Sequence, residues 1–381
     1  MCEENPMNQA IVAAALPSLY SRWMSELLDQ PIPEETKATC NDCAMCAKAG
    51  DPPEQEAQHF NPGTKCCTYD PEIPNFLAGA ILADADPAAH AGRNQFLFRV
   101  NSSAILRPQG VCPTIAEAAA HGVLHPGYGQ DASLLCPFYL AESGGICGIW
   151  KHRNARCATW YCKHERGAVG RDFWRTLKEL LADVEAHLSL RCIHALKAGT
   201  PEFRELFPML SVPNREQFQK QQAFLYRSAL PAAHVSAEEA KELKAQMWGD
   251  WLDREESFYI ECARVASTLD WSGVTAGAPQ VLRQRVANLR FSFHRLLNRR
   301  LPAILIPAPF RSVRLNDRVT RVWGYSNYDP VDIPASVLNA LSHFDRRPTE
   351  SLLESLGKDP AITLTPAWAQ ILYDFGILTS P

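Results

Sequence analysis

The distribution of cysteine constrains this chain more than any other feature of its sequence. Ten of the 13 cysteines lie between Cys40 and Cys162, and none follows Cys262. A hydrophobic core would scatter this small apolar residue along the chain, whereas a binding site gathers it at one place. The clustering therefore predicts thiol chemistry in the first half of the protein.

The cellular compartment decides what clustered thiols mean. The chain begins with the acidic stretch 1–5, where a secretory signal would carry positive charge, and it has no run of about 20 apolar residues. We therefore expect a cytoplasmic protein, in which stable disulfides are rare and clustered cysteines serve metal or redox chemistry. The formal net charge of -4 at pH 7 gives no reason to expect nucleic acid or a membrane as partner.

Nine cysteines form three groups along the sequence. The groups are the double CxxC step Cys40, Cys43 and Cys46, the adjacent pair Cys66 and Cys67, and the spaced set Cys136, Cys147, Cys157 and Cys162. A CxxC step places two thiolates on one tight turn, close enough to share a metal. Two successive CxxC steps are common at cubane iron–sulfur clusters, whereas zinc sites more often use two separated CxxC pairs. We therefore expect the nine cysteines to bind an iron–sulfur cluster of the 4Fe-4S kind, with zinc as the alternative.

The number of sites stays open, because a site with four ligands leaves room for one or two sites and at least one spare thiol. Thiolate ligands need nearby positive charge, and basic residues are well distributed for this role: Lys48, Lys65, Lys151, Arg153, Arg156 and Lys163. His152 and His164 are weaker candidates for a nitrogen ligand, since histidines lie more often on the surface. The remaining cysteines have a structural interpretation: Cys2, Cys112, Cys192 and Cys262.

The order of these motifs resembles the YkgJ-type cysteine-cluster family, which is described as zinc- or iron-chelating. The specific part is Cys-Pro-Phe-Tyr from Cys136, Gly-Ile-Cys-Gly-Ile-Trp around Cys147, and Cys-Ala-Thr-Trp-Tyr-Cys ending at Cys162. The resemblance covers residues 40–165 and implies metal binding by Cys43, Cys46, Cys66, Cys67, Cys136, Cys147, Cys157 and Cys162. The chain departs from the family pattern in the long spacing between Cys46 and Cys66, in the additional Cys40, and in Asn154, where the family has proline.

The sequence says less about the reaction than about the metal. The leading expectation is redox chemistry or the modification of a protein or peptide at an iron–sulfur cluster. A zinc protein in which the metal organises the fold is the competing class. The cysteine cluster is also distantly similar to that of flagellin lysine N-methylases, which makes an S-adenosylmethionine-dependent methylase the third alternative. The sequence contains neither a phosphate-binding Walker A loop nor a dinucleotide fingerprint, and its CxxCxxC order differs from the Cx3Cx2C of radical S-adenosylmethionine enzymes.

The hydrophobic pattern predicts a mainly α protein with small β elements. We expect an N-terminal helix and connector over 1–39, a loop-rich, metal-organised domain over 40–165, a helical region over 166–303 and a separate module over 304–381. Within these segments, the spacing predicts long helices from about residue 171, over 236–266 with a capping box at Ser236, and over 279–297. Residues 96–100 alternate like a short strand.

The C-terminal module has the pattern of a winged helix. Two strands are expected within 313–325 around the turn Asn316-Asp317, followed by helices over 335–344, 350–356 and 366–375. Thr349 and Thr365 occupy expected N-cap positions, and Gly376 follows the last helix. The module resembles PqqD-like peptide-recognition domains. That resemblance implies a peptide or protein substrate held as an added strand.

Overall fold

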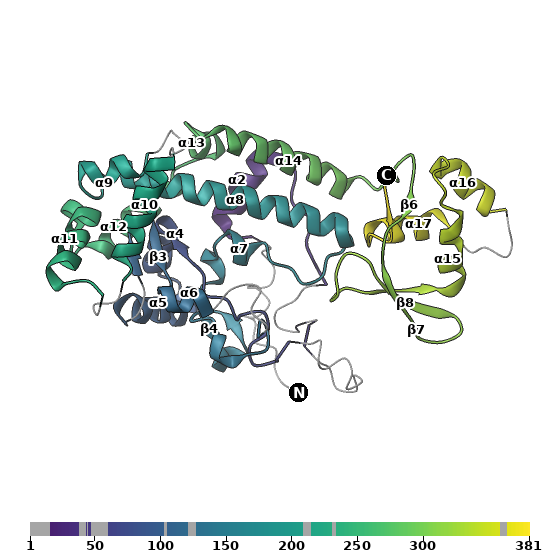
Figure 1. The fold of residues 1–381 in the computed structure, drawn as a ribbon, viewed down its shortest axis with the longest axis horizontal. Coiled ribbons are helices and arrows are strands. Elements are labelled where there is room, and N and C mark those ends of the chain that lie inside the picture. The colour runs from purple at the N-terminus through teal and green to yellow at the C-terminus, as the bar shows by residue number, and fades with distance from the viewer. Residues whose placement is uncertain are drawn as a thin grey trace. The chain divides into compact units, whose positions relative to one another are not determined.

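The computed structural model describes residues 16–37, 43, 45–46, 60–102, 105–120, 127–208, 215–230, 234–358 and 364–381. The chain forms two compact units (Figure 1). The first unit contains Met1–Pro33, Thr39–Thr159 and Lys178–Val286, and the second contains Glu34–Ala38, Trp160–Leu177 and Ala287–Pro381. The secondary structure is mainly α with small β sheets, as the sequence predicts.

Helices make up most of the first unit. They are α2 (Ser18–Leu28), α4 (Asn75–Ala83), α5 (His90–Ser102), α6 (Ile115–Ala120), α7 (Ala155–Ala158), α9 (Pro201–Leu206), α10 (Arg215–Ser228), α11 (Ala237–Trp248), α12 (Glu255–Ser267) and α13 (Trp271–Thr275). Two longer helices, α8 (Gly167–Ala195) and α14 (Gln280–Leu297), contribute residues to both units. Small antiparallel sheets join β1 (Ile73–Pro74), β3 (Gly110–Cys112) and β2 (Ile105–Arg107), and β4 (Tyr139–Leu140) and β5 (Ile146–Cys147).

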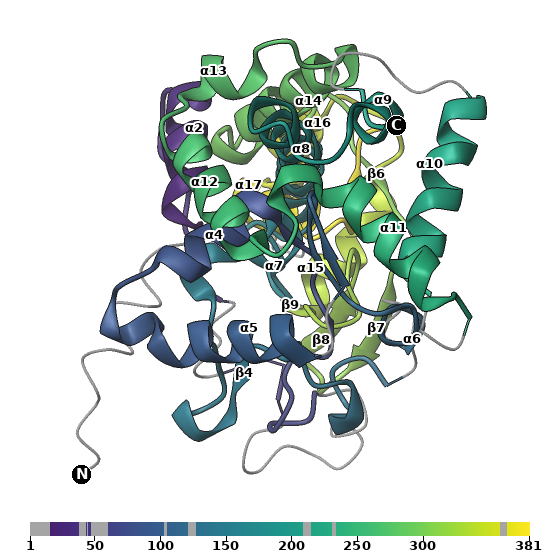
Figure 2. The same ribbon diagram turned by 90° about the vertical axis from the view of Figure 1, so that its left-hand side faces the viewer.

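Helices α4 and α12 lie side by side in the first unit (Figures 1 and 2). Helix α4 is apolar around most of its circumference, which is typical of a buried helix. Its backbone approaches α12 so closely that a Cβ atom on Gly79 would lie 1.7 Å from the carbonyl oxygen of Tyr259. Glycine at position 79 therefore sets the distance between the two helices.

Helix α8 confirms the helical stripe predicted from the sequence. The six apolar residues of that stripe are fully buried: Phe173, Leu177, Leu180, Leu181, Val184 and Leu188. On a partly exposed face of the same helix, Glu179 and Asp183 both form ion pairs with Arg285 of α14, the Asp183 pair at 3.0 Å. Apolar burial and this ion-pair group together attach α14 to α8 within the first unit.

Two predictions from local pattern are wrong. Residues 96–100 lie within helix α5, which buries Phe96 and Val100 and leaves Phe98 75% exposed, so the residues follow a helical period and not the alternation of a strand. The helix expected over 236–266 begins as predicted, with Ser236 accepting a hydrogen bond from the Glu239 amide. It is broken at Gly249, whose positive φ of 53° ends α11 before α12 begins.

The second unit combines two small sheets with three short helices. Its elements are β6 (Ile306–Pro307), β7 (Arg311–Arg314), β8 (Val319–Trp323), β9 (Val331–Pro334), β10 (Leu378–Thr379), α15 (Ala335–Asn339), α16 (Thr349–Leu356) and α17 (Pro366–Asp374). The antiparallel sheet order is β7-β8-β9, and β6 pairs with β10. The predicted turn between β7 and β8 forms, because the side-chain oxygen of Asn316 accepts from the amides of Arg318 and Val319.

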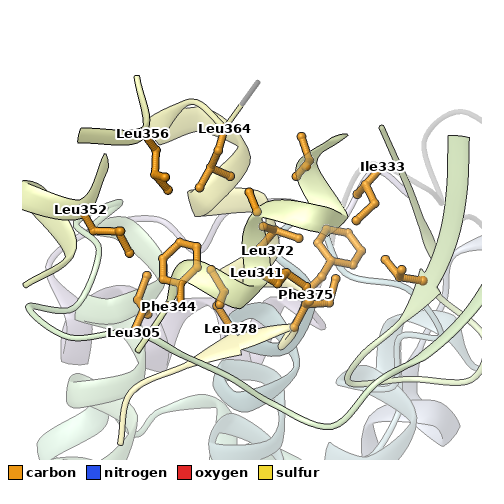
Figure 3. Close-up of a cluster of buried hydrophobic side chains, with 14 residues drawn as sticks. Leu305, Ile333, Leu341, Phe344, Leu352, Leu356, Leu364, Leu372, Phe375 and Leu378 are labelled. Atoms are coloured by element: carbon orange, nitrogen blue, oxygen red, sulfur yellow. The ribbon is translucent and has the colours of Figure 1, made fainter. Parts of the chain in front are cut away.

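One apolar core holds the second unit together (Figure 3). It contains residues from the strands and from all three helices, among them Ile333, Leu341, Leu352, Leu372 and Leu378. Of the two predicted threonine caps, Thr365 accepts from the amide of Trp368. The other prediction is wrong: Thr349 is the first residue inside α16, and Pro348 occupies the N-cap position.

No helix within the described ranges is long and apolar enough to span a bilayer.

Candidate metal centre

The first cysteine group lies beside a short bridge between two distant segments. Cys46 pairs with Phe60 in an isolated parallel bridge, and the amide of Cys46 donates to the carbonyl oxygen of Cys43 at 3.2 Å. The amide of Phe60 donates to the carbonyl oxygen of Met45 at 2.6 Å. Main-chain bonds therefore place the two described cysteines of this group on one turn. Cys40 lies outside the described residues.

The adjacent pair Cys66 and Cys67 follows a turn that is fixed by Lys65. This lysine has a positive φ of 52°, and its ammonium group donates to the carbonyl oxygens of Gly144 and Gly145 at 3.1 and 2.8 Å. These two bonds attach the turn of the cysteine pair to the loop that precedes Cys147.

Cys136 and Cys147 lie at the same open end of a β hairpin, Cys136 before its first strand and Cys147 at the end of its second. The amide of Cys136 donates to the carbonyl oxygen of Cys67 at 2.8 Å, and Tyr139 of β4 is directly opposite Cys147 of β5. Gly145 stands in the connecting turn with φ of 73°, and a Cβ atom there would lie 2.1 Å from the Tyr139 hydroxyl. The hairpin therefore needs glycine at this position, for its conformation and for the space that Tyr139 fills.

Cys157 is carried by the four-residue helix α7. The side chain of Asn154 caps this helix by accepting from the Cys157 amide at 2.9 Å, and the Arg153 guanidinium donates to the Cys157 carbonyl oxygen at 3.2 Å. The same guanidinium lies 3.4 Å from the centre of the Trp150 ring. Asn154, the departure from the family pattern, thus has a defined role at the cysteine-bearing helix.

The thiols are near enough to affect one another's ionisation. A hydrogen bond with Cys67, burial and the charge of Cys43 raise the pKa of the Cys66 thiol well above its usual value. Burial and the nearby Cys147 and Cys157 thiols do the same to the pKa of Cys136. Burial, together with Cys147 and Cys66, raises the pKa of Cys157 to about 12. Cys66 therefore interacts electrostatically with members of both neighbouring groups.

Tyr139 connects Cys46, the remaining described cysteine of the first group, to this set. Burial raises the pKa of the Tyr139 phenol, and the thiols of four cysteines raise it further: Cys67, Cys46, Cys43 and Cys66. Seven of the nine predicted ligands thus lie close enough to another of these cysteines or to Tyr139 to influence its pKa. These seven are Cys43, Cys46, Cys66, Cys67, Cys136, Cys147 and Cys157.

Cys162 belongs to the second unit, where the residues that follow it are firmly held. The amide of His164 donates to Asp329, and the guanidinium of Arg166 forms an ion pair with Asp374 at 2.5 Å. The ring of His164 lies 3.3 Å from the Tyr325 hydroxyl, and burial lowers the pKa of this histidine to about 4. The segment after Cys162 is therefore part of the polar interior of the second unit.

The other candidate nitrogen ligand, His152, contacts a carboxylate. Its Nε2 atom lies 2.9 Å from Asp84, and burial lowers the pKa of the ring. The nearby Lys151 forms an ion pair with Asp86. Both basic side chains thus have carboxylate partners in the loop between α4 and α5.

The donor chemistry fits a thiophilic metal. Half-buried thiols that raise one another's pKa form a site in which a cation would favour the thiolate form, since metal binding replaces thiol protons. Within the ranges that the structure describes, no three cysteine, histidine, aspartate or glutamate side chains are placed as ligands of a single ion. The site is therefore an assembly of neighbouring thiols whose coordination sphere is not preformed among these residues.

Several residues around the site were not found from the sequence. Asn154, Tyr139, Tyr20 and Glu185 all lie against the cysteine-bearing segments. A signal for Glu185 was present, because position 185 follows Leu181 by four residues and so lies beside the apolar stripe of α8. An ionisable residue at such a position predicts a buried polar contact.

Comparison with family models, curated proteins and solved structures finds no match. The resemblance to the YkgJ-type cluster therefore depends on the quoted cysteine motifs alone.

Proposed function

We propose that this protein binds metal through its cysteine cluster, as an iron–sulfur protein with a 4Fe-4S cluster. The observation that carries the proposal is the gathering of seven described cysteines whose thiols interact electrostatically. Three sequence-distant groups contribute to that gathering, so it is a property of the tertiary fold and not of one CxxC turn. Cys40 and Cys162 complete the proposed ligand set.

The arrangement of the thiols favours iron–sulfur over zinc. A tetrahedral zinc ion and a cubane cluster each take four thiolates, but in the cluster each thiolate binds a different iron. The adjacent residues Cys66 and Cys67 suit the second arrangement, because side chains of neighbouring residues diverge. A zinc site in which the metal organises the fold is the alternative that the test must separate.

The test is the iron, zinc and acid-labile sulfide content of protein purified without oxygen, together with its visible spectrum. Iron with matching sulfide supports the proposal, and both should fall by more than half in the double variant Cys147→Ser/Cys157→Ser. Cys112→Ser is the matched control, since Cys112 lies in β3, outside the three groups. Stoichiometric zinc without sulfide would establish the alternative, and a folded protein without either metal would refute metal binding.

We further propose that the cluster serves a redox or modification reaction on a protein or peptide, which the second unit holds as a winged-helix-like module. Strand β7 supports this role, because it is the edge strand of its sheet and all four of its residues are exposed. An exposed edge strand offers main-chain donors and acceptors to an added strand. Residues 287–381 contain ten arginines and one lysine against eight acidic residues, so an acidic peptide is the favoured partner.

A further inference from the structure

The side chain of Glu185 joins three helices of the first unit. It lies on α8, and its Oε1 atom accepts a hydrogen bond from the Tyr20 hydroxyl on α2 and one of 2.6 Å from the amide of Ala155. Ala155 is the first residue of α7, two positions before Cys157. Tyr20 is fully buried and Glu185 is 9% exposed, so these bonds form in a largely dry environment where each counts for more than in water.

Helix α7 depends on such external contacts. A helix of four residues is too short to be stable alone, and its first amides have no partner within the helix. The side-chain oxygen of Asn154 accepts a hydrogen bond from the amide of Cys157. The side-chain nitrogen of Asn154 donates to the carbonyl oxygen of Glu72 at 2.9 Å. The carboxylate of Glu185 accepts a hydrogen bond from the amide of Ala155. The main chain of Cys157 is thereby held from two directions.

We propose that Glu185 is a positioning residue that fixes Cys157 for metal binding, by holding the first turn of α7 against Tyr20 and α2. The inference depends on the proposed function, in which Cys157 is a ligand. An acidic side chain beside the apolar stripe of α8 is costly to bury, and among the described residues its hydrogen-bonded partners are Tyr20 and Ala155. These two bonds give Glu185 a structural role, which is to hold α7 in place.

The experiment compares Glu185→Ala, Glu185→Gln and Tyr20→Phe in the full-length protein after removal of metal by a chelator. Each protein is treated with iodoacetamide, and the alkylation rate of each cysteine is followed by mass spectrometry. We expect Glu185→Ala to raise the rate at Cys157 about tenfold relative to Cys112, since a lost buried hydrogen bond of this kind opens the turn. Glu185→Gln should stay near the wild-type rate, because its amide oxygen accepts the same bonds.

Tyr20→Phe keeps the packing and removes one of the two bonds, so its rate should lie between those of wild type and Glu185→Ala. An equal rise at Cys157 and Cys112 would overturn the inference, because it would report general unfolding. An unchanged rate at Cys157, or a Glu185→Gln protein as reactive as Glu185→Ala, would also overturn it.

Two outcomes keep this inference separate from the proposed function. A wild-type protein that contains no metal would refute the function, while the alkylation rates would still report whether Glu185 holds Cys157. A metal-containing wild type with unchanged Cys157 reactivity in Glu185→Ala would refute the positioning role alone. As a second readout, the Glu185→Ala protein should lose its bound metal to a chelator about tenfold faster than wild type.

Discussion

The amide of Cys136 donates a hydrogen bond of 2.8 Å to the carbonyl oxygen of Cys67. This bond joins the second cysteine group to the third, although the two are far apart in the sequence. It uses main-chain atoms alone, so serine at either position keeps it and removes only the thiol. Cysteine-to-serine variants therefore test ligand chemistry at this site without removing the bond that brings the groups together.

The contact between Gly92 and Gly148 predicts the first stability effect. Gly92 lies in α5, and a Cβ atom there would be 1.8 Å from the carbonyl oxygen of Gly148, which follows Cys147. Gly92→Ala should cost about 3 kcal/mol through overpacking and regain about 1 kcal/mol from helix propensity. We expect a lower thermal midpoint and, where metal is bound, a lower metal content.

Gly63→Ala is the control for that variant. Its Cβ atom would meet only the side-chain oxygen of Asn61, at 3.3 Å, so its effect should stay within about 1 kcal/mol. Equal thermal midpoints for the two alanine variants would contradict the close approach of α5 to the loop after Cys147.

The buried ion pair between Arg99 and Asp70 predicts a larger loss. Nη2 of Arg99 lies 2.5 Å from Oδ2 of Asp70, and the two side chains are 6% and 2% exposed. Arg99→Met leaves a buried carboxylate without this cation and should reduce the free energy of unfolding by about 3–5 kcal/mol. Lys220→Ala, which breaks an exposed pair with Glu216, should cost less than about 1 kcal/mol. Urea unfolding measures both, and similar losses would contradict the burial of the Arg99 pair.

Glu185 predicts a specific pH dependence of stability. Burial raises the pKa of its carboxyl group to about 7, although the hydrogen bonds from Tyr20 and Ala155 act in the opposite direction and the charge of Glu72 adds to the rise. The stabilisation from this raised pKa is fully present below about pH 4.5, the value for the unfolded chain. It is lost as the pH rises through about 7, because the unfolded chain ionises first.

The measurement compares the thermal midpoints of wild type and Glu185→Gln at pH 5 and pH 8. The variant cannot ionise at this position, so the stability of wild type relative to it should fall by about 3 kcal/mol between the two pH values. Parallel pH profiles for the two proteins would show that Glu185 has an ordinary pKa in the folded state.

Local signals in the sequence predicted the elements that depend on local interactions. The stripe of α8, the cap at Ser236 and the turn at Asn316 each need only neighbouring residues, and all three are confirmed. The break at Gly249 was missed although glycine is a local signal for a helix end, because the surrounding pattern remains helical. The packing that requires glycine there is not local. A Cβ atom on Gly249 would lie 3.0 Å from the backbone of Gly199, a residue of a distant segment.

At the candidate site, too, local signals in the sequence are informative and contacts between distant segments are not. Cysteine clustering in the sequence predicts which residues belong to it, because residue type and the expected compartment restrict what clustered thiols do. That ligand set stays a prediction. The sequence could not reveal that Lys65 binds two carbonyl oxygens of the hairpin turn, or that Glu185 reaches Ala155 from α8. Such contacts depend on which segments the tertiary fold brings together, and a single sequence carries no direct signal for that.

Strand β7 predicts the charge preference of the peptide binding that we propose for the second unit. The strand exposes Arg311 and Arg314, with Val313 49% exposed between them. An extended acidic peptide could pair with the strand edge through its main chain. Arg311 and Arg314 lie on opposite faces of the strand, so carboxylates on both faces of the peptide would meet them. The guanidinium of Arg311 lies 4.3 Å from the centre of the Trp323 ring, which holds that charge on the sheet.

A fluorescent decaglutamate peptide, which presents carboxylates on both faces of an added strand, tests this prediction by fluorescence anisotropy. The double variant Arg311→Glu/Arg314→Glu should bind it at least about tenfold more weakly than wild type, since like charges would then face each other across the added strand. Arg346→Glu makes a charge reversal outside the hairpin and should change the affinity by less than about twofold. A peptide with lysine in place of glutamate that binds wild type equally well would contradict selection by charge, and unchanged affinity in the double variant would place the binding surface away from β7.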